Sequence, residues 1–246
     1  MKSILITGSS RGIGKAIAKL AHQKGFKVIV HGKTDSEALQ NLHQALNGSI
    51  KAVFDVADKQ STQDSINELL NEVGTIDVLV NNAGVALNFL KDVSEMDDNK
   101  AIEEYSTNVL GTLHCIQSVL PKMLEQEAGS VINIASIKGH YNLATMSTLT
   151  FAISKAGIIS LTKALAKSYG EKGVRFNSVS PGYVETDQVN DWNEETFKRI
   201  SDGTILGRIA KTEEIAPLVL FLASKEASYI TGSDFLADGG YAIKNK

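Results

Sequence analysis

Short runs rich in β-branched residues alternate with helix-period stretches along nearly the whole 246-residue chain, and this alternation constrains the fold more than any other feature. The expected strands are Ser3–Ile6, 27–30, 51–55, 77–81, 130–135, 175–179 and Asp234–Ala237. The expected helices begin with a stripe of Ile13, Ile17, Leu20 and Ala21 and continue at 36–46, 62–73, 99–126, 151–171 and 212–223. Apolar strands that alternate with helices form a parallel sheet covered on both faces. We therefore expect one α/β domain over 1–246, with a Rossmann-type, doubly wound parallel sheet of about seven strands.

No part of the sequence marks a domain boundary, since it contains no internal repeat and no Pro/Gly/Ser-rich linker, and only three prolines. One acidic stretch, at about 183–209, fits neither period well and follows a strand end. Long connections at the carboxyl ends of parallel strands are where lids and binding loops lie. We expect this stretch to form a substrate lid.

A glycine-rich segment joins the first strand to the first helix and reads Thr7-Gly8-Ser9-Ser10-Arg11-Gly12-Ile13-Gly14. Glycine allows a sharp turn and a close approach of the backbone to a pyrophosphate. The free N–H groups and the dipole of the following helix then meet the phosphate charge. The segment predicts a dinucleotide site, although its spacing differs from the G-x-G-x-x-G pattern.

The same segment resembles the opening motif of the short-chain dehydrogenase/reductase family, Thr-Gly-x-x-x-Gly-Ile-Gly. Further motifs of that family follow in order, so the resemblance extends from Ile4 to Gly240. They are Asn81-Asn82-Ala83-Gly84, Asn108 in Asn-Val-Leu-Gly, Ser136, Lys155 in Ser-Lys-Ala-Gly, Pro181-Gly182-x-Val184-x-Thr186 and Asp238-Gly239-Gly240. The resemblance implies a nicotinamide cofactor. Its expected binding residues are Gly8, Ser10, Arg11, Gly12, Ile13, Gly14, Lys33, Asp55, Val56, Asn82, Ala83, Gly84, Lys155, Pro181, Gly182, Val184 and Thr186.

The end of the second strand indicates which cofactor is bound. An NAD enzyme places an acidic residue there to accept hydrogen bonds from the ribose hydroxyls, whereas this chain has His31-Gly32-Lys33-Thr34. Lys33 and Arg11 together would neutralise a 2′-phosphate. Asp35 is the competing acid, but it stands just before a helix and we interpret it as an N-cap. We therefore expect NADP(H). Asp55 either contacts the adenine, as the resemblance implies, or caps a turn.

In the family that the chain resembles, a hydride passes between the nicotinamide and a carbonyl or alcohol carbon while a tyrosine hydroxyl transfers the proton. A free tyrosine has a pKa of about 10, and a lysine one helical turn later lowers it. A serine holds the substrate oxygen and a helix asparagine supports a water relay. The resemblance assigns these last three roles to Lys155, Ser136 and Asn108, and it places Phe151 at the tyrosine position.

Phenylalanine keeps the shape of the ring but has no proton to donate. Loss of a general acid costs about 10²- to 10⁴-fold in rate. Tyr141 is the nearest alternative in sequence, but it does not precede Lys155 by one turn. Phe151 is either an introduced replacement or a natural loss or change of the reaction. Because the other functional positions are retained, we favour an inactivated form of a working reductase.

Composition excludes several other functions. The single Cys115 lies in an apolar stretch, which predicts a buried thiol, and the five histidines lack metal-ligand spacing. A net charge of -3 without a dense basic block argues against nucleic acid. We see no apolar run of about 18 residues and no signal segment, so we expect a cytoplasmic protein without membrane spans.

The C-terminal part is most similar to the 3-oxoacyl-acyl-carrier-protein reductases of the family, through Leu206-Gly207-Arg208, Phe221-Leu222 and Tyr229-Ile230-Thr231-Gly232. The resemblance implies an acyl thioester substrate on acyl carrier protein. It also implies a homotetramer in which the helices at 99–126 and 151–171 pack against copies of themselves. The alternatives are a reductase of another carbonyl compound and a non-catalytic NADP(H)-binding protein.

Overall fold

The computed structural model describes residues 1–140, 143–189 and 192–244. The strands of the main sheet are β1 (Ser3–Ile6), β2 (Lys27–Gly32), β3 (Ile50–Val53), β4 (Val78–Asn81), β5 (Gly129–Ile134), β6 (Val174–Pro181) and β9 (Asp234–Ala237). The helices are α1 (Gly12–Gln23), α2 (Glu37–Ala45), α3 (Lys59–Val73), α4 (Asp98–Tyr105), α5 (Gly111–Glu125), α6 (Leu149–Tyr169), α7 (Glu194–Asp202), α8 (Thr212–Ala223) and α9 (Tyr241–Lys244). Each expected strand is present: β1 and β9 have the expected bounds, and the ends of the other five differ by at most two residues.

The seven strands form one parallel sheet in the order β3-β2-β1-β4-β5-β6-β9. The direction of strand addition reverses between β1 and β4, both of which pair with parallel neighbours. In an open parallel sheet, this reversal leaves a crevice at the carboxyl ends of the strands, where ligands bind. The expected Rossmann-type fold is confirmed.

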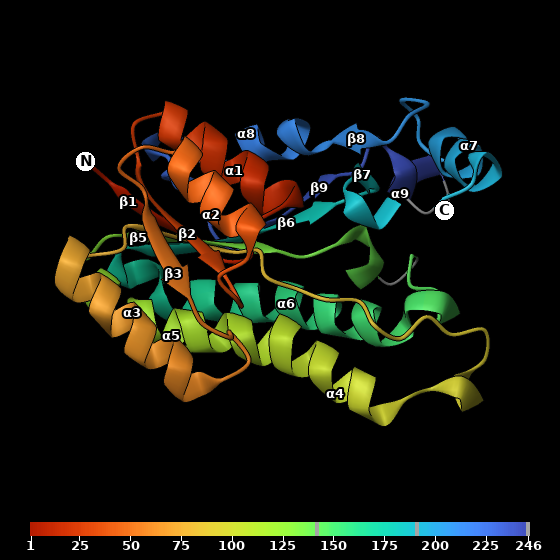
Figure 1. Cartoon of the computed structure of the whole chain (residues 1–246). Coiled ribbons are helices and arrows are strands. Elements are labelled where there is room, and N and C mark those ends of the chain that lie inside the picture. Colours follow the sequence, from red (N-terminus) through yellow and green to blue (C-terminus); the bar gives the residue numbers. More distant parts are fainter. Residues whose placement is uncertain (141–142, 190–191, 245–246) are drawn as a thin grey trace.

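Helices cover both faces of the sheet (Figure 1). Because side chains alternate along a strand, Ile4 and Ile6 of β1 join the core beneath α1, α2 and α8, while Leu5 joins the core beneath α3 and α5. All three side chains are fully buried. This two-sided burial explains why residues 4–6 of β1 are all apolar instead of alternating with polar residues.

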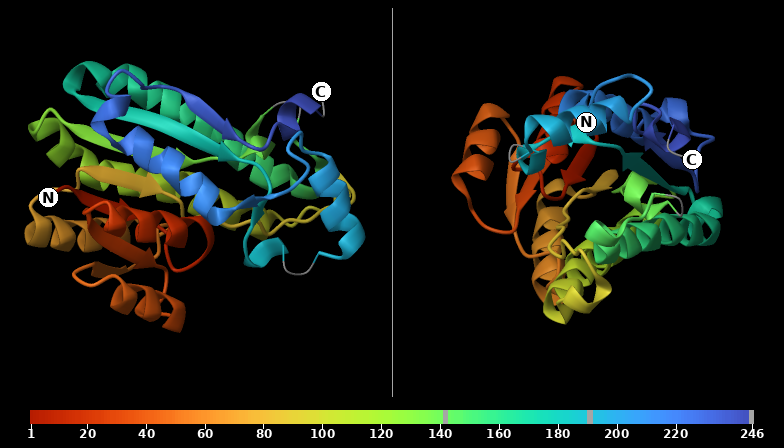
Figure 2. Two further views of the ribbon diagram at one scale, coloured as in Figure 1. Left: turned by 90° about the horizontal axis from the view of Figure 1, so that it is seen from above. Right: turned by 90° about the vertical axis from the view of Figure 1, so that its right-hand side faces the viewer.

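Two regions differ from the expected elements. The helix expected at 99–126 is interrupted by a π-helical turn at Ser106–Leu110, which separates α4 from α5. The stretch at 183–209 contains α7, and a short parallel pair of β7 (Val184–Glu185) with β8 (Ala210–Lys211) joins its two ends. Figure 2 shows this segment, with α7, at the end of the molecule opposite the N-terminus.

Helix α6 is long and apolar. Within the described residues, the helical segment Met146–Lys172 is long and apolar enough to cross a membrane, judged only by length and hydropathy. Lys155 and Lys163 interrupt this segment, so it is not an unbroken apolar run, and by itself it is weak evidence for a membrane span. In this chain α6 contacts β6 in one layer of the sandwich, and 33% of its apolar window is buried. Among the large apolar side chains of α6, Ile153 is exposed.

Candidate active site

The glycine-rich turn between β1 and α1 forms a cradle at the carboxyl edge of the sheet. Gly8 and Gly12 have φ angles of 63° and 55°, which side chains rarely adopt. At Gly14 the reason for glycine is space, because a β-carbon there would lie 2.5 Å from Nδ2 of Asn82 and 2.6 Å from the Gly8 carbonyl oxygen. Gly12 also lies against Thr186, whose Cγ2 would be 3.4 Å from a β-carbon.

Hydrogen bonds from β4 fix this cradle. The Thr7 hydroxyl accepts from the N–H groups of Asn82 and Ala83 at 2.9 and 3.0 Å. The Asn82 amide donates to the carbonyl oxygens of Thr7 and Gly8 at 2.9 and 3.0 Å. The two predicted motifs at 7–14 and 81–84 are therefore parts of one structure.

The start of α1 fits an anionic group. Arg11 is the N-cap residue, no described side chain caps the helix, and the first turn holds no acidic residue. The first N–H groups of a helix lack intrahelical partners and attract anions. Because the cradle also excludes a β-carbon at Gly14, the residues present fit a nucleotide pyrophosphate.

His31 contacts the glycine-rich turn, although the sequence patterns assigned it no role. Its ring is 2% exposed, and Nδ1 accepts from the Gly8 N–H at 3.0 Å while Nε2 donates to the Phe54 carbonyl at 2.9 Å. Burial lowers the pKa of His31 to about 4, against weaker opposing effects of Phe54 and Asp55. The ring is therefore neutral at pH 7 and supports the turn as an acceptor.

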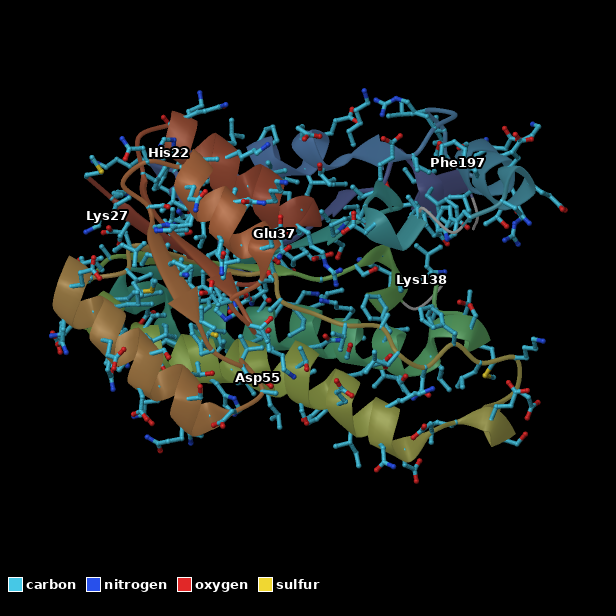
Figure 3. All side chains as sticks on the ribbon, in the orientation of Figure 1. His22, Lys27, Glu37, Asp55, Lys138 and Phe197 are labelled. Carbon is cyan, nitrogen blue, oxygen red and sulfur yellow. The ribbon has the colours of Figure 1, made fainter. Side chains whose placement is uncertain are left out.

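Lys33 and Arg11, the two cations predicted to meet a 2′-phosphate, lie at the surface and face acids. Lys33 forms an ion pair with Asp55 at 2.8 Å, and Arg11 lies 4.0 Å from Asp187. The hydrogen bond to Asp55 raises the pKa of Lys33. Asp55 also accepts from the Ala57 N–H at 3.0 Å, so the turn-capping interpretation holds. Figure 3 labels Asp55 at this site.

The prediction that Asp35 caps a helix is wrong. Ser36 is the N-cap of α2, and its hydroxyl accepts from the Leu39 N–H at 3.3 Å. Asp35 instead binds Lys51, whose Nζ donates to both carboxylate oxygens at 2.7 and 2.8 Å. Both residues can accept from a helix terminus, but a lysine on β3 lies within reach of Asp35 and neutralises it.

Asn108 and Lys155 meet beneath Gly84. A β-carbon on Gly84 would lie 3.1 Å from Oδ1 of Asn108 and 3.4 Å from Nζ of Lys155. Asn108 lies in the π-helical turn and exchanges two hydrogen bonds with the Val85 backbone, at 2.8 and 2.9 Å. Its amide also donates to Ser154 at 3.0 Å. Turns of this kind often mark functional sites.

Lys155 is 6% exposed, and its ammonium donates to the Ile134 carbonyl at 2.8 Å. Burial lowers the pKa of Lys155 to about 8. The Phe151 ring, one turn earlier on α6, has its centroid 5.6 Å from Nζ. The structure thus brings Asn108, Phe151 and Lys155 together, as expected from their positions in the sequence.

Ser136 begins the loop that follows β5, and its hydroxyl accepts from the Lys138 N–H at 3.1 Å. The loop rests directly on α6, because a β-carbon on Gly139 would lie 2.8 Å from the Ala156 nitrogen. His140 anchors the same loop to β9 through Asp234, at 3.0 Å. Tyr141, the alternative proton donor, lies outside the described residues.

The remaining predicted cofactor-binding residues have contacts within the protein. Pro181 and Val184 are buried, and Gly182 packs against Asp238, where a β-carbon would lie 2.7 Å from Cα. Ser10 and Ile13 belong to the turn and to the first turn of α1, and Ile13 packs against the core. Val56 also faces inward, since a β-carbon on Gly111 would lie 2.7 Å from its Cγ2. The side chain of Val56 therefore packs against the start of α5.

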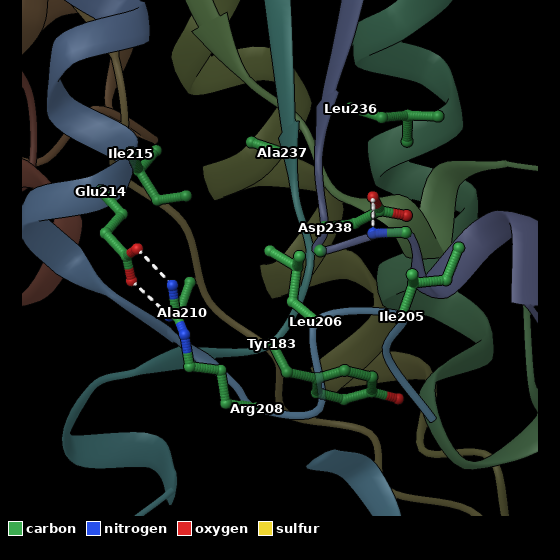
Figure 4. Close-up of a pocket in the computed structure, with 12 residues that line it drawn as sticks. Tyr183, Ile205, Leu206, Arg208, Ala210, Glu214, Ile215, Leu236, Ala237 and Asp238 are labelled. Atoms are coloured by element: carbon green, nitrogen blue, oxygen red, sulfur yellow. Dashed lines mark hydrogen bonds and ion pairs between the residues drawn. The ribbon is translucent and has the colours of Figure 1, made fainter. Parts of the chain in front are cut away.

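A pocket of about 450 Å³ lies at the base of the 183–209 segment (Figure 4). Tyr183, Leu206 and Leu236 are among its lining residues, and none of the four predicted catalytic residues belongs to it. Arg208 binds both carboxylate oxygens of Glu214 at 2.7 Å, which lowers the pKa of Glu214 to about 2. This pair ties the end of the segment to α8.

Cys115 is fully buried, as expected, and burial raises the pKa of its thiol to about 12. Among the described residues, no group of three or more His, Cys, Asp or Glu gathers as a metal site would require. Trp192 packs edge-to-face on Tyr183, with ring centroids 5.8 Å apart.

These features define a Rossmann-type α/β protein whose characteristic residues gather at the carboxyl edge of the sheet. The family model described as enoyl-(acyl carrier protein) reductase matches residues 8–242. The chain belongs to the short-chain dehydrogenase/reductase family of oxidoreductases.

Relatives match nearly the whole chain. It is 36% identical to the 3-oxoacyl-[acyl-carrier-protein] reductase FabG of Thermotoga maritima over 246 residues, covering 98% of each protein. It is 35% identical to the protein of the same name from Chlamydia trachomatis over 245 residues, covering 98% of this chain and 97% of that one.

Two solved structures superpose closely. The crystal structure of gox2181 has a TM-score of 0.92 at 28% identity, over 98% of this chain and 96% of that one. A crystal structure described as ribose-5-phosphate isomerase from Brucella melitensis has a TM-score of 0.91 at 34% identity, over 98% and 93% of the two chains. Because these names cover different reactions, the reaction must be argued from the site.

Proposed function

We propose that this chain is an NADP(H)-binding protein of the 3-oxoacyl-acyl-carrier-protein reductase type, whose own sequence lacks the proton donor of the reaction. The observation that carries the proposal is the placement of Asn108 and Lys155 beneath Gly84, with a phenylalanine ring where the resembling family has tyrosine. The names of the relatives from Thermotoga maritima and Chlamydia trachomatis support the substrate class.

Several residues support NADP(H) over NAD(H). Arg11 and Lys33 are largely exposed, and their acidic partners form surface ion pairs, each of which is worth about 0–1 kcal/mol. A 2′-phosphate can therefore compete for both cations. Asp35, the acid that would favour NAD(H), is already neutralised by Lys51.

The nicotinamide, when bound, supplies the hydride. In the proposed reduction, the Ser136 hydroxyl holds the carbonyl oxygen, and Asn108 and Lys155 maintain a polar path to it. Lys155, with a pKa of about 8, is charged at neutral pH and would lower the pKa of a phenol placed one turn earlier. Phe151 offers no such phenol. The substrate and cofactor sites remain shaped for the reaction while the final proton transfer is missing.

The experiment that tests the proposal is Phe151→Tyr. We expect the variant to raise NADPH-dependent reduction of a 3-oxoacyl thioester by about 10²-fold or more, the size expected of one general acid. The affinity for NADPH should change by less than about threefold, because the hydroxyl enters a site already shaped for a ring. Steady-state turnover and calorimetry measure the two quantities.

Two outcomes favour the alternatives. If Phe151→Tyr reduces simple ketones but no 3-oxoacyl thioester, the chain is a reductase of another carbonyl compound. If it binds NADPH and reduces neither, the chain is a non-catalytic NADP(H)-binding protein. In that case Asn108, Ser136 and Lys155 need a structural explanation.

The proposed assembly is a homotetramer, or at least a dimer, built on α4, α5 and α6. Large apolar side chains lie exposed on two of these helices, Ile102 and Tyr105 on α4 and Ile153 on α6. The segment at 183–209 is the proposed lid. Phe197 of α7 and Lys138 of the Ser136 loop lie at the same end of the molecule (Figure 3).

A further inference from the structure

Glu104 is the one aspartate or glutamate among the described residues that is fully buried. It lies near the end of α4, one helical turn before Asn108. Buried carboxylates are rare unless they are paired. No family motif includes this position, and the site described above makes no use of it.

The carboxylate of Glu104 binds the backbone that follows Gly84. Its Oε1 accepts from the N–H groups of Leu87 and Asn88, the latter at 2.9 Å. One turn later, Asn108 pairs with both backbone groups of Val85. Two side chains on one side of the helix therefore hold the whole segment 85–88. Gly84, directly before this segment, is the residue that lies over Asn108 and Lys155.

The second carboxylate oxygen of Glu104 destabilises the fold. Oε2 is buried and has no hydrogen-bond partner among the described residues. An unsatisfied buried polar atom destabilises a folded protein and calls for a specific explanation. An apolar residue would avoid this cost, but it would leave the N–H groups of Leu87 and Asn88 without an acceptor. A glutamine would keep the acceptor, although hydrogen bonds to a carboxylate are stronger.

We propose that Glu104 is a positioning residue for the reduction proposed above, on which this inference rests. It fixes segment 85–88, and thereby keeps Gly84 over Asn108 and Lys155 while substrate and cofactor bind. Asn88 extends the support, because its amide donates to the Asp97 carbonyl at 3.0 Å. The role is geometric, and Glu104 itself touches no reacting atom.

Glu104→Met tests the proposal, since methionine has a similar length and favours helices but offers no acceptor. In the Phe151→Tyr background, we expect kcat to fall by at least about tenfold, as small misplacements near a reacting centre do. The Kd for NADPH should stay within about threefold, since the phosphate cradle is separate. Glu104→Gln should restore most of the lost kcat. Glu103→Met, on the exposed side of the same helix, is the matched control and should leave kcat unchanged.

Amide hydrogen exchange in the Phe151 chain gives a readout that needs no activity. Glu104→Met should accelerate exchange at Leu87 and Asn88 relative to the chain average, whereas Glu103→Met should not. A variant with lower Tm but unchanged kcat would show a purely structural role and overturn the proposal, as would unchanged exchange at both amides. If Phe151→Tyr is itself inactive, the reductase proposal fails. Exchange at Leu87 and Asn88 then still decides whether Glu104 holds the segment.

Discussion

The His31 ring supports the cofactor turn only while it is uncharged. Its Nδ1 accepts from the Gly8 N–H, and a proton on that nitrogen would replace an attraction by a repulsion between two donors. Nearby Asp55 favours the charged ring but is itself paired with Lys33. Burial therefore dominates and lowers the pKa to about 4.

This shift predicts how stability depends on pH. The unfolded chain binds a proton at His31 at about pH 6.5, whereas the folded chain does not until about pH 4. Stability should therefore fall as the pH decreases through this window, by about 2 kcal/mol from this residue between pH 7 and pH 5. His31→Asn keeps an acceptor for Gly8 without a titratable ring. We expect a shallower loss of unfolding free energy in the variant, measured by urea denaturation. Equal pH dependence in both proteins would contradict the assignment.

Lys33 is the residue at which cofactor preference can be tested most directly. Lys33→Met removes one cation and also leaves the Asp55 carboxylate without its partner, so a 2′-phosphate meets less attraction and more repulsion. We expect NADPH to bind at least about tenfold more weakly while the affinity for NADH changes little. Calorimetry with both cofactors measures the difference.

Lys27→Met is the control for this experiment, because Lys27 begins β2 and Lys33 directly follows its other end. In Figure 3, Lys27 lies well away from Asp55, on the side of the molecule where the chain begins. It should change neither affinity. A parallel loss of NADPH and NADH binding on removal of Lys33 would show a general defect of the site instead of a contact with the phosphate.

At the scale of elements, the sequence predicted the strands well because the central strands β1 and β4 are buried along their whole length and read as apolar runs. It failed where local signals are ambiguous. Asp35 and Ser36 are adjacent cap formers, and only the position of Lys51 on β3 decides between them. Helix α7 was missed because it is nine residues long and mostly polar, with Ile200 as its one buried apolar side chain.

The candidate site shows the same division. The glycine-rich turn and the positions of Asn108, Ser136 and Lys155 follow patterns of fixed spacing, so they could be predicted. Glu104 and His31 could not, because their partners are backbone groups at 87–88, 8 and 54 that come close only through the tertiary fold. A glutamate in a polar helix is normally read as solvent-exposed. The π-helical turn around Asn108 has no comparable sequence signature either.

At the scale of the whole molecule, the layer of helices that contains α4 and α6 leaves large apolar side chains exposed to solvent. Helix α6 is rich in apolar residues, and 33% of the residues in its most apolar window are buried by this chain. Ile153 on α6 is 61% exposed, and Ile102 on the contacting helix α4 is 63% exposed. Large exposed apolar faces mark interaction surfaces. A second copy of the same face is the simplest cover, since most oligomers have closed two-fold symmetry.

We therefore predict that the double variant Ile102→Glu and Ile153→Glu dissociates a tetramer or dimer into smaller species. In the assembly, each glutamate would lose its water against an apolar face of the partner, which is unfavourable in free energy. Because a two-fold contact contains each position twice, the unfavourable free energy is doubled. Light scattering at micromolar concentration gives the mass, which for a single chain is 26.4 kDa.

Leu206→Glu is the control, because Leu206 is 65% exposed but lies between α7 and β8. The mass of this variant should match that of the parent protein. A parent protein that scatters as a monomer would refute the assembly, and the exposed faces of α4 and α6 would then require another partner.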